Sequence, residues 1–160
     1  MANKSVQVGD LAPNFERTSS GGETVSLSRF RGKSEVVLFF YPKDNSPVCT
    51  AEACAFRDSY ERFRDAGAEV IGVSADSDQS HKRFASRHKL PFHLISDPDG
   101  SLRALFGVPK TLGLFPGRVT YLIDREGVVQ HVISSQLQAS RHVDEMLSKL
   151  KESPESGKTQ

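Results

Sequence analysis

The sequence has little of what marks several specialised classes of protein. It holds two cysteines and no tryptophan in 160 residues, and two thiols are too few for a disulfide-rich secreted scaffold or a four-cysteine zinc site. Basic residues number 21 and acidic residues 20, so the formal net charge is only +1. A charge so evenly balanced predicts no binding of nucleic acid. The longest apolar run, 36–41, is far too short to span a bilayer, so no membrane insertion is predicted.

The length fits one domain with a substantial core. No internal repeat or low-complexity block interrupts residues 6–151. The last stretch, 152–160, has no large apolar residue and contains proline, glycine and serine. We therefore expect a single domain over 1–151, followed by a disordered C-terminal tail.

The hydrophobic pattern alternates between strands and helices. Residues 35–41 form a nearly continuous run of β-branched and aromatic side chains, which is typical of a strand buried on both faces. Further strands are predicted at 70–73, 92–95, 119–123 and 128–133, the last two as a hairpin. Helices are predicted at 49–66, 78–90 and 138–151. This order, after a small N-terminal β region, indicates an α/β domain of three layers with a mixed sheet.

The first cysteine lies where a buried strand gives way to a helix. Ser46 followed by Pro47 is typical of a helix start, with a hydroxyl at the N-cap and proline at the first helical position. Cys49 therefore falls in the first turn, where unpaired backbone N–H groups and the positive end of the helix dipole favour a thiolate. Pro42 and Pro47 stiffen the loop and help to hold a reactive geometry.

The second cysteine, Cys54, follows five residues later. In an intact helix the Cα atoms of such a pair are about 8.6 Å apart, whereas a disulfide requires about 7 Å or less. A bond between Cys49 and Cys54 therefore requires the first helical turns to unwind, which suits a catalytic cycle better than a structural crosslink. A metal site is disfavoured, because none of the five histidines has ligand spacing with the cysteines: His81, His88, His93, His131 and His142. From the residues alone, burial of both thiols as small apolar side chains remains an alternative.

At these residues the sequence resembles a known family. The segment Pro42-Lys-Asp-Asn-Ser46-Pro-Val-Cys49 is similar to the peroxiredoxin active-site pattern Pro-x-x-x-Thr/Ser-x-x-Cys. The wider stretch 40–58 resembles the peroxiredoxin Q subfamily, also called bacterioferritin comigratory protein. Similar stretches continue at 8–15, 67–74, 90–92, 94–97 and 117–124. The resemblance covers about residues 6–150, and the motif stands in its expected strand–loop–helix context.

The resemblance implies a thioredoxin-like fold with a small N-terminal β-hairpin, and a peroxidase that uses no metal, haem or flavin cofactor. It implies that the Cys49 thiolate attacks a hydroperoxide and becomes a sulfenic acid, and that Cys54 condenses with it to an intramolecular disulfide. The expected reductant is thioredoxin, or else glutaredoxin, and the expected state is a monomer. No hydrophobic segment follows Lys4, so no secretory signal is predicted. The expected location is the bacterial cytoplasm or, after loss of a transit peptide, a plastid.

Three further residues match functional positions of the family. The resemblance implies that the Ser46 hydroxyl forms a hydrogen bond near the thiolate, that Arg118 steadies the developing charge, and that Pro42 shields the pocket from water. From the residues alone, Ser46 fits an N-cap and Arg118 fits a solvated surface residue. Arg57 and Asp58 are expected to form a structural ion pair.

Two positions depart from the family pattern. Many relatives have glycine where Val48 stands, and a β-branched residue there predicts a stiffer helix start and slower disulfide closure. Ser46 stands where many relatives have threonine, and it keeps the hydroxyl without the methyl group.

Two other functions fit parts of the pattern. A thiol–disulfide oxidoreductase usually has Cys-x-x-Cys at the helix start, which differs from the spacing of this pair. A binding or chaperone-like module with inert thiols would be unaffected by Cys49→Ser. Rapid oxidation of Cys49 by peroxide distinguishes the peroxidase from both.

Overall fold

A five-stranded sheet forms the centre of the molecule, in the order β5-β4-β3-β6-β7. The computed structural model describes residues 6–108, 118–134 and 139–152. The strands are β3 (Glu35–Phe40), β4 (Ala68–Ser74), β5 (His93–Ser96), β6 (Val119–Ile123) and β7 (Val129–Ser134). β4 pairs in parallel with β3 and β5, whereas β6 runs antiparallel to β3 and β7. The prediction of a mixed sheet ending in a hairpin is confirmed.

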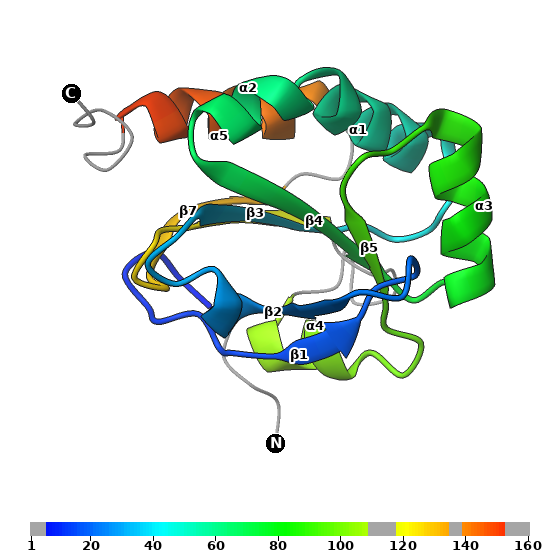
Figure 1. Ribbon diagram of the computed structural model, residues 1–160, viewed down its shortest axis with the longest axis horizontal. Coiled ribbons are helices and arrows are strands. Elements are labelled where there is room, and N and C mark those ends of the chain that lie inside the picture. Colours follow the sequence, from blue (N-terminus) through cyan, green and yellow to red (C-terminus); the bar gives the residue numbers. More distant parts are fainter. Residues whose placement is uncertain (1–5, 109–117, 135–138, 153–160) are drawn as a thin grey trace.

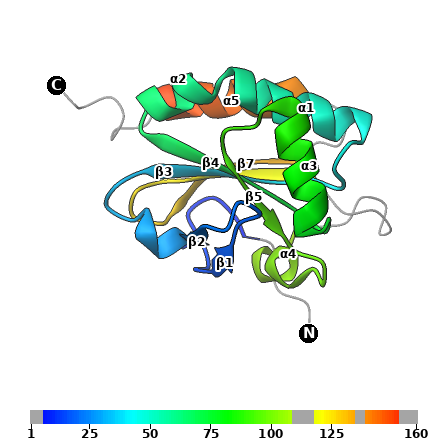
Figure 2. The ribbon, with the colours of Figure 1, turned by 45° about the vertical axis from the view of Figure 1, so that its right-hand side comes forward.

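Other elements cover both faces of this sheet (Figure 1). One face carries the helices α1 (Pro47–Asp58), α2 (Tyr60–Asp65) and α5 (Ala139–Glu152), with α3 (Asp78–His88) beside β5. The opposite face carries the hairpin of β1 (Glu16–Thr18) and β2 (Thr24–Ser26), the short helix η1 (Leu27–Arg29) and α4 (Ser101–Phe106). Figure 2 shows the same three layers from a second side. The α/β class, the three layers and the N-terminal hairpin agree with the sequence-based expectation.

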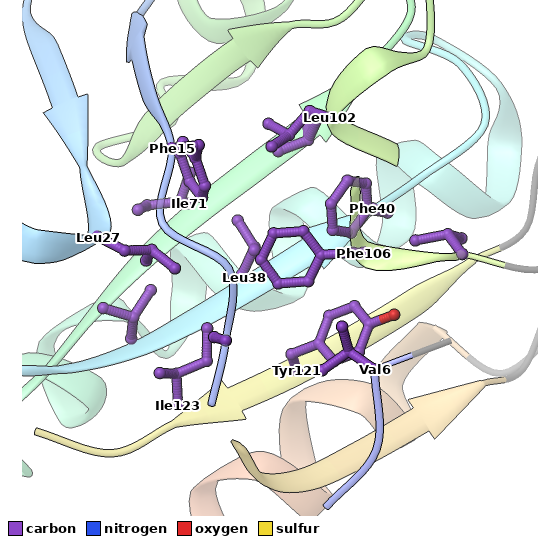
Figure 3. Close-up of a cluster of buried hydrophobic side chains, with 14 of the residues drawn as sticks. Val6, Phe15, Leu27, Leu38, Phe40, Ile71, Leu102, Phe106, Tyr121 and Ile123 are labelled. Carbon is purple, nitrogen blue, oxygen red and sulfur yellow. The ribbon is translucent and has the colours of Figure 1, made fainter. Parts of the chain in front are cut away.

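β3 connects two hydrophobic cores, because its residues alternate between the faces of the sheet and all of them are buried. Val37 and Phe39 belong to the core under α1 and α5. Leu38 and Phe40 belong to the opposite core, where Figure 3 shows them packed around Phe106. This burial on both faces explains the continuous apolar run in the sequence. It also fixes the end of β3, from which the cysteine loop departs.

The predicted helix over 49–66 is wrong in one respect, because the chain forms two helices there. α1 ends at Asp58 and α2 begins at Tyr60, with Ser59 between them at φ −104° and ψ 5°. The Ser59 hydroxyl accepts a hydrogen bond of 2.9 Å from Nη2 of Arg62. The apolar spacing of three and four residues continues across Ser59, so this spacing does not reveal where α1 ends.

The short helix α4 was not expected, since the sequence pattern indicated only a connecting segment there. Its first turn is capped by the Asp97 carboxylate, which accepts backbone hydrogen bonds of 2.9 Å from Leu102 and from Arg103. A six-residue helix is too short to show an apolar period. The signal that could have found it is Asp97 itself, an acidic residue ahead of the Pro-Asp-Gly turn.

The C-terminal prediction is only partly described by the structure. Glu152, the first residue of the predicted tail, lies in the last turn of α5, and 153–160 lie outside the described residues. Among the helices of the described ranges, none combines the length and apolarity needed to cross a membrane.

Candidate active site

The loop between β3 and α1 is held in place through Asp44, which is 3% exposed. Its carboxylate accepts hydrogen bonds from the Tyr41 hydroxyl at 2.7 Å and the Ser80 hydroxyl at 2.8 Å. Nδ1 of His81 lies 2.7 Å from Oδ2 of the same carboxylate. The backbone N–H of Asp44 donates to the Asp76 carboxylate at 2.7 Å. The loop that leads into α1 is therefore anchored to α3 and to the end of β4.

The Asp44–His81 contact has the geometry of a buried ion pair. Nε2 of His81 lies 3.2 Å from the carbonyl oxygen of Ile95, which can only accept a hydrogen bond, while Nδ1 faces the carboxylate. Both ring nitrogens therefore face acceptors, an arrangement that suits an imidazolium. Burial alone raises the pKa of Asp44, but the hydrogen bonds from His81 and Tyr41 and the charge of His81 lower it below its ordinary value.

The structure brings Cys49 and Arg118 together, although they are 69 residues apart. Nη2 of Arg118 lies 3.0 Å from Sγ of Cys49, and the two residues are 3% and 1% exposed. Cys49 lies in the first turn of α1, where the helix dipole favours negative charge. A buried guanidinium beside this sulfur places a positive charge and an N–H donor where a reacting cysteine would carry negative charge.

Ser46 occupies the N-cap of α1 and Pro47 the first helical position, as the sequence indicated. The expected hydroxyl cap is wrong, however, because no side chain caps this helix. The Ser46 hydroxyl instead donates to the carbonyl oxygen of Lys43 at 3.0 Å, which turns it toward the loop. Pro42 is half-buried at the start of the same loop. The functional roles expected of Ser46 and Pro42 stay predictions.

Cys54 lies further along α1 and is half-buried, and both cysteines are free thiols. Because α1 is continuous from Pro47 to Asp58, the two sulfurs cannot bond without unwinding of this helix. Arg57 donates from Nε to Asp58 at 2.9 Å, which confirms the expected ion pair. It also donates from Nη1 to the carbonyl oxygen of His88 at 2.7 Å, so α1 is tied to the end of α3 close to Cys54.

Sequence reasoning missed Glu52, which lies one helical turn after Cys49. Its side chain is fully buried, and Oε1 lies 2.5 Å from Nη1 of Arg118. Burial raises the pKa of Glu52 to about 7, although the charge and hydrogen bond of Arg118 act in the opposite direction. Residues three apart share one helix face, so its spacing from Cys49 was the available signal.

A second missed residue is Arg103, on α4. Its Nη2 donates to the carbonyl oxygen of Tyr41 at 3.2 Å, and its guanidinium lies 5.7 Å from the centre of the Phe40 ring. Burial lowers the pKa of Arg103. A second cation thus lies at the end of β3. No sequence pattern pointed to it, because α4 itself was not predicted. In the part of the chain that the structure describes, no cluster of three or more His, Cys, Asp or Glu side chains is placed to hold a metal ion.

Comparison with known proteins places the chain in a family. Residues 8–132 match the model of the AhpC/TSA family. The chain belongs to the AhpC/TSA family. It is 52% identical over 143 residues to the chloroplastic peroxiredoxin Q of Triticum aestivum, which covers 89% of this chain and 65% of the wheat protein. The chain therefore spans just under two thirds of that relative's length.

Solved structures of AhpC/TSA proteins agree with this fold. Peroxidoxin BcpB of Mycobacterium tuberculosis superposes with a TM-score of 0.84 at 35% identity, covering 92% of this chain and 97% of that one. The bacterioferritin comigratory protein of Xanthomonas campestris gives a TM-score of 0.81 at 31% identity, covering 94% and 98%. The predicted resemblance to peroxiredoxin Q and the thioredoxin-like fold are both confirmed.

Proposed function

We propose that this chain is a thiol peroxidase that reduces hydroperoxides through Cys49. The observation that carries the proposal is the Arg118 guanidinium, 3.0 Å from Sγ of a buried cysteine in the first turn of a helix. Membership of the AhpC/TSA family supports it. The Xanthomonas campestris relative is described by its alkyl peroxide reduction activity, which supports alkyl hydroperoxides, beside hydrogen peroxide, as the substrate class.

In the first step the Cys49 thiolate attacks the terminal oxygen of the hydroperoxide. A sulfur–oxygen bond forms, the oxygen–oxygen bond breaks, and the departing alkoxide takes that electron pair and gains a proton from solvent to become an alcohol. Sulfur is oxidised to a sulfenic acid and the peroxide is reduced. The Arg118 guanidinium, held on Glu52 at 2.5 Å, remains in place as charge moves from sulfur to oxygen.

In the second step the Cys54 thiolate attacks the Cys49 sulfenic acid. A disulfide forms, and the sulfenic oxygen leaves as water after taking up a proton. This step requires α1 to unwind, because both cysteines lie on one continuous helix. The absence of a side-chain cap on α1 favours such unwinding, since an N-cap hydrogen bond contributes about 1 kcal/mol to helix stability.

In the third step a dithiol protein of the thioredoxin type reduces the disulfide and takes up the two oxidising equivalents. Glutaredoxin is the alternative reductant. The cycle as proposed needs one chain only, because both thiols lie on the same helix, and we propose that the protein acts as a monomer.

We propose a plastid as the location, with the bacterial cytoplasm as the alternative. The wheat relative is named as chloroplastic, which supports the proposal. Fractionation of source cells, followed by detection of this chain beside a stromal marker, tests it. Detection outside the plastid fraction would contradict it.

The experiment that tests the catalytic proposal is intact mass under non-reducing conditions. Reduced protein receives one equivalent of hydrogen peroxide. The expected product is two hydrogens lighter, and neither Cys49→Ser nor Cys54→Ser should give it. Cys54→Ser should instead gain oxygen at Cys49. An unchanged mass in the parent protein would reject the proposal.

A further inference from the structure

Glu52 presents a buried oxygen that lacks a hydrogen bond. Oε1 holds Arg118 at 2.5 Å, but Oε2 receives no hydrogen bond from the described residues. The side chain is fully buried. A buried carboxylate oxygen without a donor is strongly disfavoured, so a neighbouring group must compensate for it.

The group that faces this oxygen is His142, on α5. Nδ1 of His142 lies 3.4 Å from Oε2 of Glu52 and 2.7 Å from Oγ1 of Thr120. His142 is fully buried, and α5 packs directly against α1. The histidine therefore reaches Glu52 of the active-site helix from α5, an element late in the chain.

The protonation of His142 Nδ1 decides how this ring acts on Glu52. If Nδ1 carries a hydrogen, Oγ1 of Thr120 accepts it at 2.7 Å, and the positive N–H group lies 3.4 Å from Oε2. If Nδ1 has a lone pair instead, the Thr120 hydroxyl donates to it, and Nδ1 and Oε2 face each other as two acceptors. The first arrangement favours an ionised Glu52 and the second a protonated one.

We propose that His142 is a positioning residue for peroxide reduction: it keeps Glu52 ionised and aligned on Arg118, and through Arg118 it sets the pH range over which Cys49 reacts. This inference rests on the proposed role of Cys49 as the nucleophile. His142 itself touches neither the thiol nor, in the proposed mechanism, the peroxide.

Electrostatics gives the sign of the expected effect. An ionised Glu52 partly neutralises Arg118, so less positive potential reaches Cys49. A pKa of about 7 for Glu52 means that a small change in its surroundings alters its charge near neutral pH. Glu52 of α1 and Thr120 of β6 are among the groups that face His142, and Arg118 contacts the other oxygen of Glu52. Elsewhere on α5, Oε2 of Glu145 lies 2.6 Å from Nε2 of His131 on β7.

The test uses His142→Leu in a Cys54→Ser background, so that Cys49 is the single thiol. The rate of alkylation by iodoacetamide, measured from pH 4 to pH 9, reports the thiolate. The rate of oxidation by hydrogen peroxide reports the reaction. Without the histidine, the buried Glu52 carboxylate loses the group that faces its second oxygen, so we expect its neutral form to be favoured and the alkylation profile to move toward lower pH. Oxidation should nevertheless be about tenfold slower, because Arg118 loses its alignment.

The leucine variant should therefore be alkylated at lower pH but oxidised more slowly. General damage to the site would instead lower the alkylation rate and the oxidation rate together. His142→Asn, whose amide nitrogen replaces Nδ1, is expected to stay close to the parent profile. If the leucine variant does not fold, His142→Phe carries the same expectation. His131→Gln is the matched control, because it removes another histidine–glutamate contact, between β7 and α5, and leaves His142 and Glu52 in place.

A second arm tests whether His142 acts through Glu52. In a Glu52→Gln background, His142→Leu should cause no further change in either profile. The inference would be overturned if His142→Leu shifted the alkylation and oxidation profiles equally in the Glu52→Gln background. It would also be overturned if the profiles of His142→Leu coincided with those of the parent. Failure of the proposed function is distinguishable, because Cys49 of the parent would then not react with peroxide at all.

Discussion

At the scale of single residues, Arg118 connects the two charged groups of the site. One guanidinium nitrogen lies 2.5 Å from Glu52 and the other 3.0 Å from Cys49. A lysine ammonium is a compact point charge without the planar fork that holds these two contacts in a fixed geometry. We therefore expect Arg118→Lys to slow the oxidation of Cys49 by peroxide about 100-fold.

Alkylation and single-turnover oxidation, measured over a pH series in the Cys54→Ser background, check this expectation. Arg64→Lys on the exposed face of α2 is the control and should leave both profiles unchanged. A lysine variant as reactive as the parent would show that the paired geometry of Arg118 is dispensable.

Asp44 is predicted to make stability depend on acid pH. Folding lowers its pKa from 3.8, so its contribution is present above about pH 4 and is lost as pH falls through the lowered pKa. We expect Asp44→Asn to destabilise the protein by about 3 kcal/mol at pH 7, and by less in stronger acid. Urea unfolding at pH 7 and at pH 3 measures the difference. Asp65→Asn, at an exposed position, should unfold with nearly the free energy of the parent at both pH values. A loss of stability in Asp44→Asn that is equal at pH 7 and pH 3 would contradict the prediction.

The residues of the site differ in how far the sequence could predict them. The helix start at Ser46 and Pro47 is a local pattern, so Cys49 could be placed without knowledge of the fold. Arg118 was identified through family resemblance alone, because its contact with Cys49 spans 69 residues. The raised pKa of Glu52 depends on complete burial, a property of packing that no local pattern contains.

At the scale of elements, α1 combines a weak beginning with a firmly packed second half. Its first turn has no side-chain cap. Further along, Phe56 is fully buried and stacks on Phe39 of β3, with ring centres 4.5 Å apart. Unwinding that joins Cys49 to Cys54 is therefore expected to begin at Pro47 and to stop before Phe56.

Val48 stands in the part of α1 that must unwind. Relative to alanine, glycine destabilises a helix by about 1 kcal/mol and valine by about 0.6 kcal/mol, so Val48→Gly should weaken the helix start by about 0.4 kcal/mol and accelerate disulfide closure about twofold. Rapid-quench mass analysis after a peroxide pulse measures the interval between the sulfenic acid and the disulfide. Lys82→Gly, an exposed helical position in α3, is the control. Closure no faster in Val48→Gly than in the parent would contradict this role of the helix start.

The helix boundaries show where local patterns stop being informative. α3 ends at His88, with Lys89 in the left-handed region at φ 53°, close to the end predicted from Pro91. That boundary was predictable because proline acts locally. The break at Ser59 was not predictable, since no proline or glycine marks it and the apolar spacing continues across it.

At the scale of the whole molecule, the class of fold was predictable but the order of strands was not. Alternating strands and helices indicate an α/β domain whichever strands pair. The pairing of β3 with β6 joins residues more than 80 positions apart, Val36 with Ile123 among them, and burial of β3 on both faces does not reveal which strand lies beside it. That pairing also brings Arg118, which directly precedes β6, close to Cys49, which follows β3. The site therefore depends on a contact between segments that are far apart in the sequence.

The tight packing between β3, β4 and β5 gives the last prediction. A Cβ atom on Gly72 would lie 2.8 Å from Cζ of Phe39 and 2.9 Å from Cδ2 of Leu94, closer than side chains normally approach. We expect Gly72→Ala to reduce the free energy of unfolding by about 2 kcal/mol. Gly21→Ala, whose nearest atom lies at 3.8 Å, should change it by less than about 0.5 kcal/mol. Urea unfolding compares the two, and equal losses would contradict the packing argument. Because Phe39 also stacks on Phe56 of α1, the Gly72 variant should close its disulfide faster than the parent, which would link the core to the reactive helix.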